Sequence, residues 1–140
     1  MVYKKIGSKY VIRLDKGEEI VESLKQFCVV SGVQLATVCG IGAVTRATIS
    51  IYELNARQYH MRDLMGDHEI TNLTGNISMM NEEVYLHLHV NLSDVNQNTW
   101  GGHLNSAYVG GTCEIVVDVI DGELNREFDE QVGLNLINII

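Results

Sequence analysis

The strongest constraint on the fold is the run 84–92, in which apolar and polar side chains alternate without a break. The apolar side chains are Val84, Leu86, Leu88, Val90 and Leu92, and the polar ones are Tyr85, His87, His89 and Asn91. Successive side chains of a β-strand point to opposite faces, so this pattern predicts a strand with one buried face and one polar face. His87 and His89 would then lie side by side on the polar face.

Weaker alternation predicts further strands on both sides of this run. They are expected at residues 10–14, 43–52, 59–65, 69–79 and 113–120. In the second of these segments, the apolar residues expected on the buried face are Ala43, Ala47, Ile49 and Ile51. The dipeptide Asp121-Gly122 is typical of a tight hairpin turn, which predicts that 123–127 pairs with the strand before it.

One segment has helical spacing instead. Its apolar positions are Ile20, Leu24, Phe27 and Cys28. Asp15 with Glu18 three residues later resembles a capping box at the helix start, and Gly32 is a favourable C-cap. One helix packed on a mostly antiparallel β-sheet is an α+β fold, and the length suits a single domain, residues 1–140. The apolar segment 134–140 needs cover from this domain or from a neighbouring subunit.

The composition excludes several classes of function. A formal net charge of −8 argues against duplex DNA binding, because that binding depends on Lys and Arg at the phosphates. No apolar run reaches the roughly 20 residues that span a bilayer, and no apolar signal segment stands at the start, so we expect a cytoplasmic protein. Cys28, Cys39 and Cys113 lack CxxC spacing, and are interpreted as small core residues.

Three of the five histidines could bind one metal ion. His87 and His89 share a strand face, and His103 follows two glycines at the end of a polar segment, 93–102, that we interpret as a loop. Three imidazoles leave one coordination position open, as in catalytic zinc sites, although imidazole also suits iron, copper and nickel. The alternative is that His87 and His89 are polar residues on a solvated sheet face and that His103 is unrelated to them.

Other polar residues give weaker signals. His60 and His68 are expected to be exposed. A metal-bound water would need a proton acceptor, and the candidate carboxylates are Glu53, Asp94, Glu114 and Asp118. A plain surface role is the alternative for each of them, so the sequence names no catalytic residue.

Four segments taken together, 40–44, 69–78, 87–89 and 101–104, resemble the PPC (plant and prokaryote conserved) domain over about residues 10–120. The resemblance implies a single-domain α+β protein that assembles as a homotrimer. His87, His89 and His103 match the histidine pattern of the bacterial branch, which implies a divalent metal, with zinc favoured over iron or another ion. The fold is also similar to that of acetolactate decarboxylases, which hold zinc with three histidines.

Two hypotheses of function follow. In the first, the metal site binds or transforms a small anionic or carbonyl-bearing molecule. In the second, the chain is a DNA-binding or regulatory interaction module without catalysis. Plant members of the family carry an AT-hook with an Arg-Gly-Arg-Pro core before this domain, and the absence of proline here rules out that core.

Overall fold

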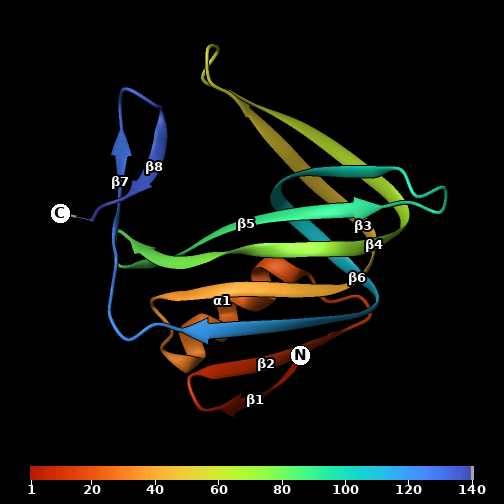
Figure 1. The fold of residues 1–140 in the computed structure, drawn as a ribbon, viewed down its shortest axis with the longest axis horizontal. Helices are drawn as coiled ribbons and strands as arrows, with labels where there is room; N and C mark the ends of the chain where they lie inside the picture. Colours follow the sequence, from red (N-terminus) through yellow and green to blue (C-terminus); the bar gives the residue numbers. More distant parts are fainter. Residues whose placement is uncertain (140) are drawn as a thin grey trace.

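A computed structural model describes residues 1–139 of the chain, and Figure 1 shows it as one large sheet, one helix and a separate small hairpin. The helix is α1 (Ile20–Ser31). The strands are β1 (Val2–Ile6), β2 (Lys9–Asp15), β3 (Ala36–Glu53), β4 (Gln58–Met80), β5 (Glu83–Ser93), β6 (Thr99–Val119), β7 (Arg126–Asp129) and β8 (Leu134–Ile137). Within the described residues, no helix is long and apolar enough to cross a membrane.

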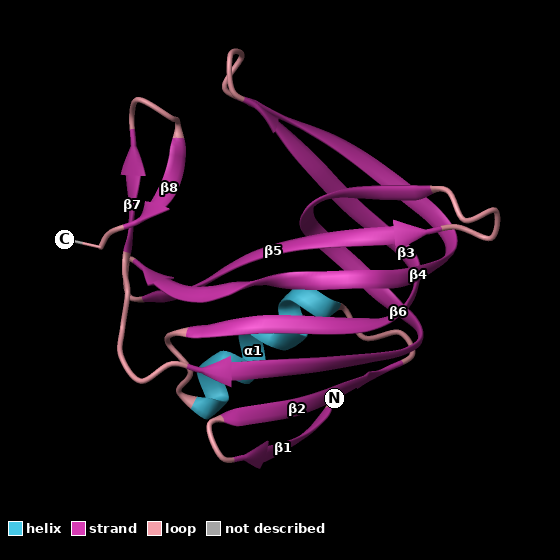
Figure 2. Ribbon diagram, in the orientation of Figure 1, coloured by secondary structure: helices cyan, strands magenta, loops and turns pink. Residues whose placement is uncertain are grey.

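The large sheet is antiparallel and has the strand order β1-β2-β6-β3-β4-β5. It curls on itself, because the first residues of β6 also pair with β5 while the rest of β6 pairs with β2 and β3. Helix α1 packs across one face of the sheet (Figure 2). The predicted α+β arrangement of one helix on a mostly antiparallel sheet is therefore correct, with strands supplying most of the structure.

The apolar face of α1 forms the centre of the core, as its spacing predicts. Its buried residues are Ile20, Leu24, Phe27 and Cys28. The ring of Phe27 packs edge-on against Tyr3 and Tyr10, with centroid distances of 5.1 Å and 4.9 Å. Gly32 ends the helix in the left-handed conformation, with φ 65° and ψ 30°, which is the geometry expected of a glycine C-cap.

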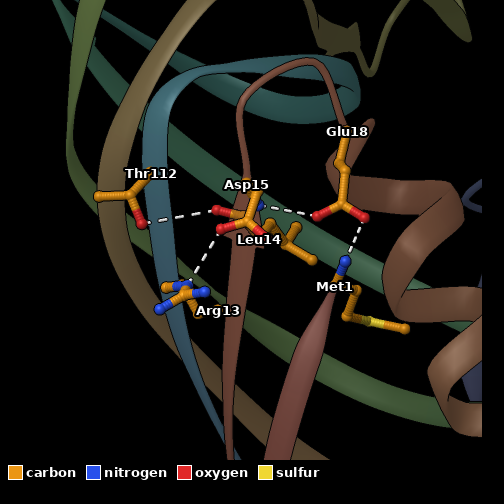
Figure 3. A network of polar contacts seen from close by, with 6 residues as sticks. All are labelled: Met1, Arg13, Leu14, Asp15, Glu18 and Thr112. Carbon is orange, nitrogen blue, oxygen red and sulfur yellow. Dashed lines mark hydrogen bonds and ion pairs between the residues drawn. The ribbon is translucent and has the colours of Figure 1, made fainter.

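The start of α1 differs from the capping box that the sequence suggests. The N-cap is Glu19, whose carboxylate accepts the backbone N–H of Glu22 at 2.6 Å. Asp15 is still in β2, and its N–H donates to Glu18 Oε2 at 2.7 Å. Glu18 also contacts the amino group of Met1 (Figure 3). The two predicted capping residues therefore hydrogen-bond to each other across the turn between β2 and α1 and do not cap the helix.

Two of the predicted strands are longer than expected, and their alternation is interrupted. Segments 59–65 and 69–79 belong to the single strand β4. In β3 the register shifts between Val44 and Arg46, and such a bulge reverses which side chains face the core. Val44 is therefore buried and Ala43 only partly buried, contrary to the prediction, whereas Ala47 and Ile49 beyond the bulge are buried as predicted. Ile51 is 67% exposed, which also contradicts the prediction.

The hairpin predicted at Asp121-Gly122 does not form. Segment 123–127 does not return along β6, because the end of β6 already pairs with β2 on one side and β3 on the other. The chain continues instead into β7, which pairs with β8. The predicted apolar tail is thus partly a strand, in which Leu134 and Ile137 are half-buried, while Ile139 is exposed and residue 140 lies outside the described part.

The cysteines comprise two buried thiols and one exposed thiol. Cys28 and Cys113 are buried, as predicted, and burial raises the pKa of each thiol to about 12. Cys39 is exposed, which contradicts its predicted place in the core. Its neighbour Val38 faces the core, and alternation along β3 therefore turns Cys39 to the opposite face.

Candidate metal centre

The three predicted ligands come together on two neighbouring strands. His87 and His89 lie on β5, and His103 on β6 pairs directly opposite His89. One ring nitrogen from each of the three lies within 4.8 Å of the others. The Nε2 atoms of His87 and His89 are 3.2 Å apart. The ring centroids are separated by 5.0 Å to 5.7 Å.

His103 is held by a strand and not by a loop as predicted. Strand β6 begins at Thr99, so only residues 94–98 connect it to β5. The first residues of β6 show no alternation of apolar and polar side chains, so the sequence did not indicate a strand there. Pairing with β5, and not burial of one face, holds these residues in place. All three imidazoles are consequently fixed by the main-chain hydrogen bonds of one sheet.

Two glycines allow the strands around the histidines to approach one another closely. A Cβ on Gly102 would lie 2.5 Å from the carbonyl oxygen of Ser50 on β3. A Cβ on Gly75 of β4 would lie 2.0 Å from the carbonyl oxygen of His87. Any other residue at either position would push apart the strands that carry the histidines.

The surroundings favour neutral imidazoles. Burial, together with the charge of Arg126 and the other two histidines, lowers the pKa of His87 to about 4. Burial and the neighbouring His89 also lower the pKa of His103. A neutral imidazole has a free lone pair on one nitrogen, which is the form that binds a metal ion.

Further side chains border the histidines and were not identified from the sequence. The ring of Tyr59 lies 5.9 Å from that of His103. The guanidinium of Arg126 lies over the ring of Tyr85, 4.7 Å from its centroid. Tyr85 could have been found, because it stands two residues before His87 in the same alternating run. Arg126 gave no such signal, because it follows a turn whose pairing the sequence predicted wrongly.

The two remaining histidines lie outside this group. His60 is exposed, as predicted, and its Nε2 lies 2.6 Å from Glu53 Oε2. His68 is buried, which contradicts the prediction of an exposed residue. Its Nδ1 lies 2.8 Å from the carbonyl oxygen of Gly66, and its ring packs edge-on against Trp100. The sequence interpretation placed His68 in a turn, whereas it lies inside the long strand β4.

None of the four candidate carboxylates belongs to the histidine group. Glu53 is the partner of His60, and Asp118 pairs with Lys9. Asp94 accepts the backbone N–H groups of residues 96 and 98 within the β5–β6 turn. Glu114 is exposed on β6. Among the described residues, the donor set is therefore three imidazoles alone.

The fold and this donor set define a small α+β protein with a candidate metal centre. A family model for the Plants and Prokaryotes Conserved (PCC) domain matches residues 1–121, and the chain belongs to this family. The resemblance seen in the sequence is thereby confirmed.

Solved structures agree with this assignment over nearly the whole chain. A candidate DNA-binding protein from Bacteroides thetaiotaomicron has a TM-score of 0.95 at 37% identity, over 98% of this chain and 96% of that one. The metal-containing protein of Archaeoglobus fulgidus has a TM-score of 0.89 at 36% identity, over 99% of both chains. A PPC protein from Pyrococcus horikoshii has a TM-score of 0.87 at 28% identity, over 99% of this chain and 96% of that one.

Two more distant similarities cover only parts of larger proteins. Acetolactate decarboxylase from Bacillus subtilis has a TM-score of 0.56 at 15% identity, over 83% of this chain and 54% of that one. This confirms the expected similarity of fold and extends no further. A curated relative, the bifunctional protein GlmU of a Synechococcus strain, is 29% identical over 127 residues. The match covers 89% of this chain but only 19% of that protein's length.

Proposed function

We propose that this protein binds a divalent metal ion through His87, His89 and His103 and presents the ion to a small molecule. Zinc is the first choice of metal, and iron is the second. The observation that carries the proposal is the convergence of three ring nitrogens within 4.8 Å of one another.

The spacing of the nitrogens fits the proposed ion. Zinc binds histidine nitrogen at about 2.0–2.1 Å in tetrahedral geometry, which places any two ligand atoms about 3.3 Å apart. The Nε2 atoms of His87 and His89 are 3.2 Å apart. The ring nitrogen of His103 lies within 4.8 Å of the other two, so the three nitrogens could bind one ion.

The donor set also indicates what the site could do. Three protein ligands leave a fourth position open, and a bound zinc ion would there polarise a carbonyl or lower the pKa of a water molecule. His89 is exposed, so the group is accessible to small molecules. One similar structure, 36% identical, is that of a protein described as metal-containing.

Metal analysis of untagged protein tests the proposal. We expect about one zinc or iron ion per chain in the wild type and substoichiometric metal in His89→Ala. His60→Ala is the matched control, because this exposed histidine pairs with Glu53 and lies outside the group. Equal metal content in wild type and His89→Ala would overturn the proposal.

We also propose that the chain forms a homotrimer, as the family resemblance implies. The arm formed by the ends of β3 and β4 carries exposed apolar side chains, namely Ile51, Leu54, Met61 and Met65. By the strand register, Met61 and Met65 lie on one face of this arm and Ile51 on the other. Exposed apolar side chains favour burial against another copy. Sedimentation should give a trimer for the wild type and smaller species for Met61→Glu, whereas a monomeric wild type would contradict the proposal.

DNA binding is the second candidate, because a similar structure is that of a candidate DNA-binding protein. The charges oppose it. Of the basic residues near the N-terminus, Lys9 pairs with Asp118 and Arg13 pairs with Asp15. Fluorescence anisotropy with duplex DNA at low salt tests this second candidate function. Phosphate contacts would give an affinity that falls steeply with salt. We expect no binding.

A further inference from the structure

A buried cation lies close to the histidine group without an acidic partner. Arg126 is only 7% exposed. Among residues 1–139, no carboxylate lies within ion-pair distance of it. Burying a charge is costly unless an opposite charge accompanies it. The position therefore suits a ligand that brings a negative charge.

Neutral groups orient the guanidinium but leave its charge uncancelled. Arg126 donates from Nε to Ser78 Oγ at 2.8 Å, from Nη1 to the carbonyl oxygen of Asn135 at 2.8 Å, and from Nη2 to Asn76 Oδ1 at 2.7 Å. The ring of Tyr85 supports the group from one side. A guanidinium has five N–H donors, so two have no partner among the described residues.

The sheet register places this charge beside the histidines. Asn76 pairs directly with His87, and Ser78 pairs with Tyr85. Paired residues of antiparallel strands lie on the same face, so the groups that hold Arg126 share a face with His87 and His89.

The hairpin that carries Arg126 is held at both ends. At one end the guanidinium binds β4. At the other end Tyr52 Oη donates to the carbonyl oxygen of Val132 at 3.0 Å, and Arg57 donates to the carbonyl oxygens of Glu130 and Gln131 at 3.0 Å and 2.9 Å. Figure 1 shows this hairpin, in dark blue, rising beside the β3–β4 arm. Binding residues need such support to keep their geometry.

A second polar group near the histidines lacks a partner. Ser50 pairs directly with His103, and its hydroxyl is the buried side-chain polar atom without a hydrogen bond in the described part of the chain. A buried hydroxyl without a hydrogen bond is unfavourable and uncommon in native structures. The hydroxyl adds a neutral donor on the same face of the sheet.

We infer that the small molecule taken at the histidine group is a carboxylate, and that Arg126 recognises its negative charge. This inference rests on the proposed metal site. The guanidinium selects the anion, and the ion held by the three histidines binds a neighbouring oxygen of the same ligand. Arg126 lies beyond residues 1–121, which the family model matches, so the selection belongs to the C-terminal hairpin and not to the matched domain.

Isothermal titration of zinc-loaded protein with glycolate and with its neutral analogue glycolamide tests the inference. The two probes have nearly the same shape and differ in charge. We expect wild type to bind glycolate at least about tenfold more tightly than glycolamide, as a hydrogen bond to a charged group provides. In Arg126→Gln the preference should fall at least about threefold below the wild-type value, because the zinc ion alone then favours the anion, and glycolamide binding should change little.

Two further variants separate charge recognition from support of the hairpin. Arg126→Lys keeps the charge and should retain a preference for glycolate. Arg57→Gln loosens the hairpin turn without changing the charge beside His87, and it should keep the wild-type preference.

The zinc content of each sample distinguishes the two proposals. Zinc bound at one ion per chain with no preference for glycolate in the wild type overturns the inference about Arg126 and leaves the metal site standing. Wild-type protein that binds no zinc overturns both. Loss of the preference in Arg57→Gln as strongly as in Arg126→Gln would also overturn the inference, because the hairpin and not the charge would then be responsible.

Discussion

The two ends of the curled sheet are built from different kinds of residue. Under α1 the core is apolar, and Ile12, Leu24 and Phe27 have no exposed surface. At the other end His87 and His103 are half-buried, His89 is exposed and the charged Arg126 is buried. Polar groups at such positions are costly, so we infer that the apolar end supplies the stability that allows the other end to hold them.

The largest effect is expected from Phe27→Ala. Removing this fully buried ring leaves a cavity next to Tyr3 and Tyr10 and should lower the free energy of unfolding by about 3–5 kcal/mol. Urea unfolding followed by circular dichroism at a fixed protein concentration measures it. Val29→Ala, on the exposed side of the same helix, should change stability by less than about 0.5 kcal/mol. Equal effects of the two variants would contradict this account of the core.

Gly102→Ala tests the close approach of strands at the histidine end. The added Cβ would meet the carbonyl oxygen of Ser50 at 2.5 Å, so the strands must move and stability should fall by about 1–3 kcal/mol. Metal affinity should fall as well, because His103 is the next residue. Gly111→Ala is the control in the same strand, since its Cβ would meet nothing within 4 Å. Unchanged zinc affinity in Gly102→Ala would show that this approach does not position His103.

The pH dependence of the metal-free protein should also distinguish the two ends. Folding lowers the pKa of His87 from 6.5 to about 4, so the unfolded chain binds more protons between these values. Stability is therefore highest above pH 6.5 and falls as the pH drops towards 4. We expect a loss on the order of 1 kcal/mol, because the ring is half-exposed and keeps part of its hydration.

Thermal unfolding of chelator-treated protein between pH 7 and pH 4.5 checks this slope. His87→Gln should flatten it, because glutamine does not titrate. The same slope in His87→Gln and wild type would contradict the assigned pKa.

Tyr52→Phe should have a smaller and more local effect. It removes the hydroxyl that donates to the carbonyl oxygen of Val132, which contributes about 0.5–1.5 kcal/mol. Hydrogen exchange should become faster in residues 126–137 and stay unchanged in α1. Unchanged exchange in 126–137 would mean that this contact does not hold the hairpin.

Thiol labelling should leave stability unchanged and still distinguish buried from exposed cysteines. Cys28 and Cys113 are buried with pKa values of about 12, so almost none of either thiol is the reactive thiolate at pH 8. Only Cys39 is exposed. Folded protein should therefore take up one equivalent of iodoacetamide, and Cys39→Ser should take up none. Rapid labelling of a second thiol would contradict the described burial.

Local patterns predicted the helix-covered end well. The spacing of Ile20, Leu24 and Phe27 determines the buried face of α1. Gly32 ends the helix in the left-handed conformation that favours glycine. The errors arose where distant strands decide the outcome. A bulge after Val44 changes which side chains of β3 face the core, so the prediction was wrong at Ala43 and correct at Ala47 and Ile49. The occupied edges of β6 prevented the predicted hairpin at Asp121-Gly122. Neither bulges nor free edges can be read from a single segment.

The candidate site was predicted in its members but not in its construction. The alternation of β5 places His87 and His89 on one face without any knowledge of the fold. The position of His103 depends on β6 pairing with β5, and that of Arg126 on a hairpin that folds back against β4. Both are contacts between distant parts of the chain, so pattern alone could not place them.

The most direct test of the central claim is a crystal structure of zinc-loaded protein with an anomalous difference map recorded at the zinc absorption edge. The account predicts one peak, bonded at about 2.0–2.1 Å to a nitrogen of His87, His89 and His103, with a fourth position open to solvent or ligand. A map with no peak at these histidines, or with zinc only at other residues, would contradict it.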